Sequence, residues 1–152
     1  KSLWRISPLT AWRLADLGAT ETVLADENLS KRLRTIEPDG FALVVDATGI
    51  PEVLEDAFGY LRPRGTLWVF GVTPRESRIS FAPYEVFRKD LTIFGSFAVN
   101  RTFQQSIAMI AGGTVKVEPL ISHTLPLESF VEGFELAQSD PRRMKVQYQV
   151  AS

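Results

Sequence analysis

The sequence has no cysteine and only one histidine, His123, among its 152 residues. The absence of cysteine excludes disulfides, a thiol nucleophile and any zinc site with cysteine ligands on this chain. No apolar run approaches the roughly 18 residues of a membrane-spanning helix, and the N-terminus lacks the apolar segment of a signal peptide. We therefore expect a cytoplasmic protein without a membrane partner.

An excess of either charge is also absent. The chain has 17 lysines and arginines against 18 acidic residues, spread along its whole length, and its net charge is −1. This balance argues against a nucleic-acid-binding surface or an acidic tail. With 45% hydrophobic residues and no repeat or linker-like stretch, we interpret residues 1–152 as one unit with a sizeable core.

The chain does contain an alternation of strand and helix patterns, centred on residues 41–72. Apolar runs at 42–45 and 67–69 are typical of strands buried on both faces. A helix is predicted between them, from Pro51 to a stop at 62–65. A buried strand, a helix and a second buried strand predict a right-handed crossover unit. The apolar stripe of this helix comprises Val53, Leu54, Ala57, Phe58 and Leu61.

Similar patterns continue on both sides of this unit, which predicts an α/β fold with a mostly parallel sheet. Strands are expected at 1–6, 22–24, 90–97, 119–124 and 144–150. Helices are expected at 9–18, 26–36, 84–89, 102–111 and 127–138. The last two helices should turn apolar faces inward, formed by Phe103, Ile107 and Ile110 and by Phe130, Phe134 and Ala137.

Three of the predicted strands have glycine at or just beyond their carboxyl ends. Ligands of open α/β sheets bind outside these ends, and glycine lets the backbone approach a ligand closely. The segments therefore predict a ligand site, although the same glycines are also typical of ordinary turns. We call them the first, second and third strand-end segments: Asp46, Ala47, Thr48 and Gly49; Gly71, Val72 and Thr73; Gly95, Ser96 and Phe97.

Several stretches carry a resemblance to a known family. They read LADLGATETV, FALVVDATGIPEVLEDAFGYLRPRGTLWVFGV, VFRKDLTIFGSF, PLISHTLPLESFVEGFELAQ and RRMKVQYQV. In this order, over nearly the whole chain, they resemble the medium-chain, zinc-type alcohol and polyol dehydrogenases. The resemblance implies a Rossmann-like, doubly wound parallel sheet that binds NAD or NADP.

The resemblance also implies roles for individual residues. In the family, the backbone of the first segment passes the adenosine side of the cofactor. Backbone groups of the second segment meet the nicotinamide amide, and the third segment lines the nicotinamide pocket. Lys145 matches a basic residue that can reach the pyrophosphate. The alternative is that the segments are strand-end turns and that Lys145 is a solvated lysine.

Arg5 departs from the usual pattern of the family. It aligns near the end of the second strand, where an NAD enzyme normally has an acidic residue that binds the ribose hydroxyls. A guanidinium favours a 2′-phosphate through charge-assisted hydrogen bonds, so we expect a preference for NADP. Lys1 and Arg13 could add positive potential. For His123 we expect a structural role, because neither a carboxylate nor a cysteine stands near it at metal-ligand spacing.

Compared with the family, two features are missing. Family members begin with a catalytic domain that holds zinc and substrate, followed by a first strand and a glycine-rich turn that binds the pyrophosphate. This sequence starts at about the second strand. In the 3-2-1-4-5-6 order the first strand is central, so we expect two interior edges to lack a partner. Another chain, an upstream segment or a rearranged pairing would have to fill the gap.

We therefore interpret the chain as a partial Rossmann-like domain with the C-terminal tail of an NAD(P)-dependent alcohol or polyol dehydrogenase. We assign no catalytic residue and no metal ligand to it, and expect zinc only in the missing catalytic domain. One alternative is a non-catalytic module, a homodimer joined through the edge strand that begins at Asp90 and ends at Phe97. Another is a fragment of a zinc-free enzyme of the quinone-reductase type.

Overall fold

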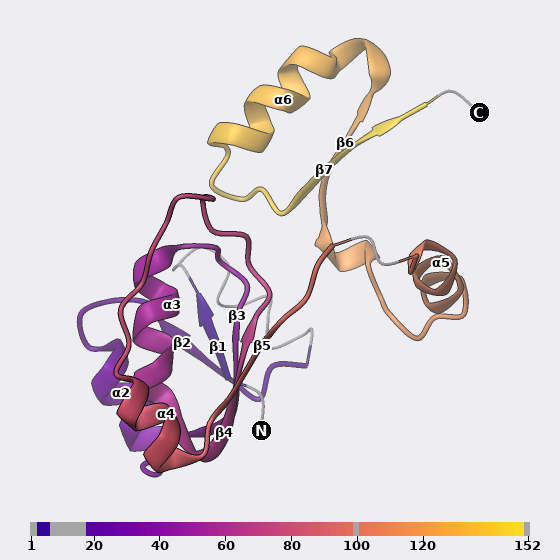
Figure 1. The fold of residues 1–152 in the computed structure, drawn as a ribbon. Helices are drawn as coiled ribbons and strands as arrows, with labels where there is room; N and C mark the ends of the chain where they lie inside the picture. Colours follow the sequence, from indigo (N-terminus) through magenta and orange to yellow (C-terminus); the bar gives the residue numbers. More distant parts are fainter. Residues whose placement is uncertain (1–2, 7–17, 99–100, 151–152) are drawn as a thin grey trace.

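The computed structural model describes residues 3–6, 18–98 and 101–150 (Figure 1). Strands and helices alternate along these residues, as expected for the α/β class. The strands are β1 (Leu3–Ile6), β2 (Glu21–Leu24), β3 (Phe41–Asp46), β4 (Leu61–Val69), β5 (Thr92–Gly95), β6 (Ile121–Pro126) and β7 (Lys145–Gln149). The helices are α2 (Leu29–Ile36), α3 (Pro51–Ala57), α4 (Pro83–Lys89), α5 (Phe103–Ala111) and α6 (Phe130–Ser139). The helix expected at 9–18 falls almost entirely outside the described residues.

The strands form three parallel sheets rather than one. Their orders are β1-β2, β3-β4-β5 and β6-β7, and every pair is parallel. In the 3-2-1-4-5-6 order, β1 and β2 correspond to the strands numbered 2 and 3, and β3 to β5 correspond to those numbered 4 to 6. The split between the first two sheets therefore falls where the first strand would lie. Among the described residues β1 does not pair with β3, so a rearranged pairing does not close the gap.

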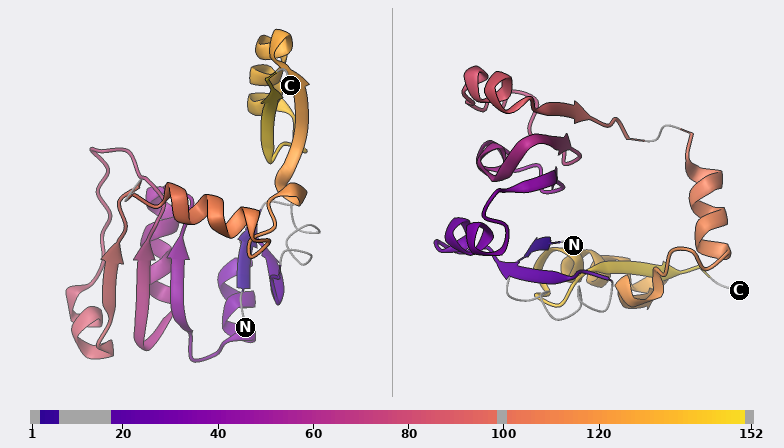
Figure 2. Two further views of the ribbon diagram at one scale, coloured as in Figure 1. Left: turned by 90° about the vertical axis from the view of Figure 1, so that its right-hand side faces the viewer. Right: turned by 90° about the horizontal axis from the view of Figure 1, so that it is seen from below.

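The main core lies between the β3-β4-β5 sheet and the helices on one of its sides (Figure 2). Leu54 and Ala57 of α3 pack with Leu61 and Leu67 of β4, and Leu67 is completely buried. The apolar stripe predicted for this helix is therefore confirmed at its centre. Because α3 returns the chain from β3 to the neighbouring parallel strand, the crossover unit forms its own core.

The opposite face of this sheet is uncovered. Leu43 and Val45 of β3 are 52% and 43% exposed, and Phe94 of β5 is 43% exposed. The expectation that 42–45 would be buried on both faces is thus wrong for the described residues. In the right-hand view of Figure 2, α5 lies apart from the sheet.

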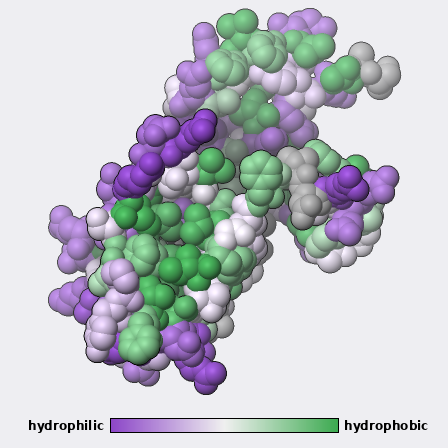
Figure 3. All heavy atoms as spheres, viewed as in Figure 1, coloured by the Kyte–Doolittle hydropathy of each residue, from purple (hydrophilic) through white to green (hydrophobic). Residues whose placement is uncertain are grey.

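The inward faces expected for the last two helices are also wrong. No residue of α5 is buried, and its Phe103 and Ile107 are 67% and 63% exposed. In α6 the expected face of Phe130, Phe134 and Ala137 is exposed, and Figure 3 shows hydrophobic side chains at the surface there. The helical period correctly marks an apolar face, but it does not supply the surface that would cover that face.

Several element boundaries differ from the expectation, and the structure explains three of them. Strand β4 starts at Leu61, not at 67, and the expected helix stop at 62–65 is an irregularity within it, where Arg64 has φ 61°. The strand expected at 90–97 is only Thr92–Gly95, because Asp90 is the left-handed cap of α4. Helix α2 begins at Leu29, since Asp26 instead accepts the backbone N–H of Asn28 in a turn. Among the described helices, none is long and apolar enough to span a membrane.

We expect Leu67→Ala to reduce the free energy of unfolding by about 2–5 kcal/mol, because it leaves a cavity in the helix-covered core. The matched control is Leu43→Ala on the uncovered face of the same sheet, which should change it by less than about 1 kcal/mol. Urea denaturation followed by circular dichroism measures both. Equal losses for the two variants would contradict the one-sided core.

Candidate functional site

The three strand-end segments come together at one edge of the β3-β4-β5 sheet. In the register of this sheet, Asp46 pairs with Val69, and Val69 pairs with Gly95. The three strands therefore end level with one another. The backbone N–H of Ser96 reaches the carbonyl of Val69 at 3.4 Å, which joins the third segment to the end of β4. The segments are neighbours in space, as their position after parallel strands implied.

Asp46 connects the first two segments. Its side chain is buried and its carboxylate accepts hydrogen bonds from the backbone N–H of Thr48 (2.9 Å), the hydroxyl of Thr48 (2.6 Å) and the N–H of Gly49 (3.3 Å). Its backbone carbonyl accepts the N–H groups of Phe70 (3.0 Å) and Gly71 (2.6 Å). The carboxylate is thus occupied by the protein itself, and Asp46 fixes the two loops.

Two glycines allow these loops to cross in direct backbone contact. Gly49 has φ +67°, and a Cβ there would lie 2.8 Å from the carbonyl carbon of Val72. A Cβ on Gly71 would lie 2.9 Å from the N–H nitrogen of Thr48 and 2.9 Å from the Asp46 carboxylate. Both glycines are therefore required by the packing of the loops themselves. The alternative interpretation as turn glycines is correct to this extent, and it is compatible with a ligand above the loops.

Trp68 positions the third segment, and the sequence reasoning did not identify it. Its indole N–H donates to the hydroxyl of Ser96 at 3.2 Å. Its ring stacks on Phe94, with centroids 5.3 Å apart, and meets Phe70 edge to face at 5.4 Å. The alternation of Trp68, in β4, and Phe70, just after it, was the available signal, because alternate residues of an extended segment share one face. Phe97, by contrast, is 95% exposed.

Arg5 and Lys145 belong to other sheets than the one that carries the three strand-end segments. Arg5 lies in β1 and pairs with Val23, while its side chain is outside the described part of the chain, as are Lys1 and Arg13. Lys145 begins β7 and pairs with Ile121 in the β6-β7 sheet. Its side chain is exposed, and its backbone carbonyl accepts a hydrogen bond from the hydroxyl of Ser122.

His123 has a carboxylate neighbour that the spacing along the sequence did not reveal. Its Nε2 lies 3.2 Å from the carboxylate of Asp140, which is distant in the sequence but follows α6 directly. The side chain of Arg142 and then its backbone N–H hold the pKa of Asp140 down at about 2, against the opposing effect of burial. Among the described residues, no group of three or more His, Cys, Asp and Glu side chains could hold a metal ion.

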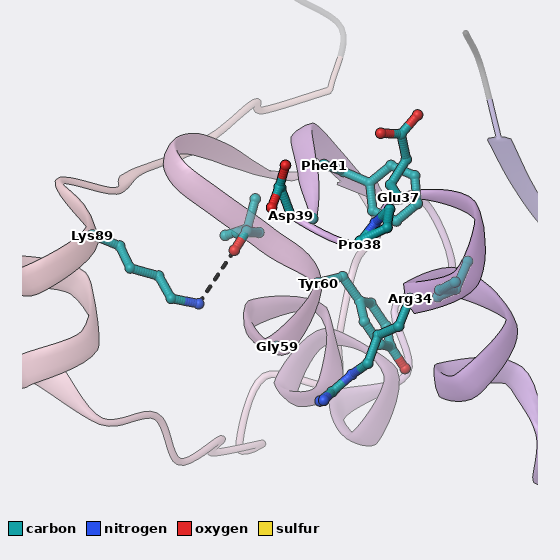
Figure 4. Close-up of a pocket in the computed structure, with 11 residues that line it drawn as sticks. Arg34, Glu37, Pro38, Asp39, Phe41, Gly59, Tyr60 and Lys89 are labelled. Atoms are coloured by element: carbon teal, nitrogen blue, oxygen red, sulfur yellow. Dashed lines mark hydrogen bonds between the residues drawn. The ribbon is translucent and has the colours of Figure 1, made fainter.

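The described cavities lie elsewhere. One of about 230 Å³ is shown in Figure 4. Its wall includes Phe41, which begins β3, so it lies at the end of the sheet opposite to Asp46. Lys89 donates from its ammonium to the carbonyl of Leu61 at 3.2 Å in this wall (Figure 4). A second cavity, of about 160 Å³, also includes none of the predicted site residues. Concavity alone would not have identified the strand-end segments.

Comparisons with known proteins all indicate one family of dehydrogenases. Residues 9–112 match the family described as zinc-binding dehydrogenase. D-altritol 5-dehydrogenase of Agrobacterium fabrum is 38% identical over 133 residues, which are 88% of this chain and 38% of that protein. The chain thus spans well under half of this relative.

Solved structures share the fold. An alcohol dehydrogenase from Escherichia coli CFT073, complexed with NADH, has a TM-score of 0.84 and 18% identity over 95% of this chain and 43% of its own. A Sinorhizobium meliloti 1021 protein of the zinc-binding dehydrogenase type, bound to NADP, has a TM-score of 0.80 and 19% identity, again over 95% and 43%.

We expect Gly71→Ala to destabilise the chain by about 1–3 kcal/mol and to shift the amide resonances of Thr48 and Val72, because the loops have no room for a methyl group. Gly59→Ala is the control, since a Cβ there meets nothing within 4 Å. Chemical denaturation and a two-dimensional amide spectrum measure these effects. Unchanged Thr48 and Val72 resonances in Gly71→Ala would show that the loops do not cross as described.

Proposed function

Because this chain belongs to the zinc-binding dehydrogenase family, we propose that it is the cofactor-binding part of an NAD(P)-dependent oxidoreductase that acts on an alcohol or polyol. The observation that carries the proposal is the level ending of β3, β4 and β5, with a glycine at each end. Residues 1–152 would then form a partial Rossmann-like domain followed by the C-terminal tail of the enzyme. The proposal includes a cytoplasmic location.

The cofactor would lie along this edge of the sheet. Its adenosine side would pass the first strand-end segment, and its nicotinamide would meet the second and third. The close crossing of Gly49 and Gly71 keeps side chains out of the path of the dinucleotide, and the backbone groups of the second segment would meet the nicotinamide amide. When bound, the nicotinamide supplies the acceptor or donor of hydride. The residues of this chain bind and orient it.

This chain does not fit a zinc site. The whole sequence has no cysteine and one histidine, and the described residues contain no group that could hold a metal. Zinc ligands and the substrate pocket would therefore belong to a catalytic domain that is not part of this sequence. We derive no step of the reaction through zinc for these residues.

We further propose that the protein is a homodimer joined through β5. This strand is the outer member of the β3-β4-β5 sheet, and all four of its residues are exposed. Two copies can pair identical edges about a two-fold axis, which covers the unpaired N–H and C=O groups. The same contact would serve a non-catalytic interaction module, so it does not depend on cofactor binding.

The cofactor proposal is tested by fluorescence titration of the 152-residue chain, with its 17.0 kDa mass verified, against NADPH and NADH. We expect weak but saturable binding that favours NADPH, because the Arg5 guanidinium can bind the 2′-phosphate. Arg5→Asp should lower NADPH affinity by about tenfold or more, through the loss of at least one charge-assisted hydrogen bond, and should not lower NADH affinity, because an acidic side chain can bind the ribose hydroxyls.

Arg64→Asp is the control for this titration, since Arg64 is 85% exposed at the opposite end of the sheet. It should bind both nucleotides as the wild type does. If neither nucleotide binds the correctly folded chain, the cofactor role is wrong for these residues. The chain would then be an inactive fragment or a dimerising interaction module.

The dimer proposal is tested by sedimentation velocity. Ile93→Lys places like charges near each other across the two-fold axis and should shift the protein from dimer to monomer. Phe87→Lys is the control, because Phe87 is 81% exposed on α4, outside β5. A monomeric wild-type chain at micromolar concentration would rule out the β5 interface.

A further inference from the structure

A polar network surrounds His123 and joins β6 to the beginning of β7. The ring Nε2 of His123 lies 3.2 Å from the Asp140 carboxylate, and its Nδ1 lies 2.9 Å from the hydroxyl oxygen of Ser122. The same hydroxyl oxygen accepts the backbone N–H of Met144 at 2.9 Å and is 3.1 Å from the carbonyl oxygen of Lys145. Four contacts therefore converge on Ser122 and His123.

The number of available hydrogens decides how many of these contacts form together. A carboxylate only accepts, so Nε2 must carry a hydrogen toward Asp140. If the imidazole is neutral, Nδ1 is an acceptor and competes with the Lys145 carbonyl for the single hydrogen of the Ser122 hydroxyl. One of the two acceptors then loses its hydrogen bond.

An imidazolium removes this competition. Its Nδ1–H donates to Ser122, and the Ser122 hydroxyl is free to donate to the carbonyl of Lys145. The two lone pairs of the Ser122 oxygen accept the hydrogens of His123 and Met144. Every contact in the network is then a complete hydrogen bond, and the bond from His123 to Asp140 is charge-assisted.

The charges around the His123 ring decide whether its surroundings favour the neutral imidazole or the imidazolium. The side chain of Asp140 is 7% exposed and that of His123 is 18% exposed, so their contact is mostly shielded from water. Arg142, which is 83% exposed, also binds Asp140 and opposes a second positive charge. Arg143 donates to the backbone carbonyl of Asp140, and the Lys145 ammonium is exposed. Among these charged groups, the Asp140 carboxylate is the one that contacts the ring.

We propose that Ser122, His123 and Asp140 form a proton-dependent latch, which holds the beginning of β7 on β6 and is fully hydrogen-bonded only while His123 is an imidazolium. The latch fixes the backbone of Met144 and Lys145, and it operates whether or not the chain binds a cofactor. When the proton leaves, one hydrogen bond of the network is lost and the start of β7 loosens.

The direction of the pH effect follows from proton linkage. Because the complete network contains one more proton than the broken one, the latch is closed at lower pH and opens as the pH rises. The lower limit is set by Asp140, whose pKa is lowered to about 2. Protonation of Asp140 removes the charge that His123 faces.

The test is the pH dependence of amide hydrogen exchange at Met144 in the full 152-residue chain, expressed as a protection factor. In the wild type we expect protection to fall about fivefold between about pH 5 and pH 8, the difference between a charge-assisted and a neutral hydrogen-bonded network. His123→Gln keeps a polar bridge but cannot take up the proton, so its Met144 protection should not change with pH.

Arg142→Gln is the matched control, because it removes a charge from Asp140 without touching His123. This variant should have a lower Met144 protection factor at both pH values, and that factor should still fall between about pH 5 and pH 8. Protection that is constant in the wild type, or that falls equally in His123→Gln, would overturn the latch.

A second measurement applies even if a variant does not fold. Since the chain has one histidine, the nitrogen resonances of its ring report the protonation of Nδ1 directly in the wild type. We expect Nδ1 to lose its proton over the same pH range in which Met144 loses protection. Loss of this proton with unchanged Met144 protection would also overturn the proposal.

Discussion

The hydrogen bonds of Asp46 are the interaction on which the strand-end region depends. One buried residue binds its own loop through the side chain and the neighbouring loop through its carbonyl. Its position is fixed in turn by β3, whose register with β4 makes the two strands end level. Because the carboxylate already has three protein donors, its contribution is to shape the backbone. Any ligand at this edge would meet the two loops that Asp46 holds, rather than a free negative charge.

The crossover unit shows which part of a fold a sequence can specify locally. The stripe of α3, the strands on either side and the glycine after each strand were predicted, because each depends on residues close together in the chain. The uncovered face of the sheet and the exposed face of α5 were not. An apolar face at Leu43 or Phe103 indicates that something should cover it, but the covering surface is not encoded in the same segment.

The candidate site likewise has parts that the sequence predicts and parts that it does not. The three strand-end segments were found from glycine and strand patterns, and parallel topology then brings them together. The roles of Trp68 and Asp140 depend on contacts between residues far apart in sequence, with Ser96 and His123 respectively. Such pairs have no periodic signal. The irregularity in β4 was hidden for a different reason, since Pro63 and Gly65 are typical of a helix stop and also of a bulged strand.

The C-terminal unit of β6, α6 and β7 has its own stabilising contacts. Tyr148 of β7 donates its hydroxyl to the carbonyl of Phe130 at 2.7 Å and stacks on the ring of that residue. Gly133 leaves the space into which the Tyr148 ring fits, because a Cβ there would lie 2.8 Å from it. These contacts do not involve His123 or Asp140, so they persist when the His123 network changes. A change of protonation at His123 should therefore loosen the beginning of β7 while its far end, at Tyr148, stays attached to α6.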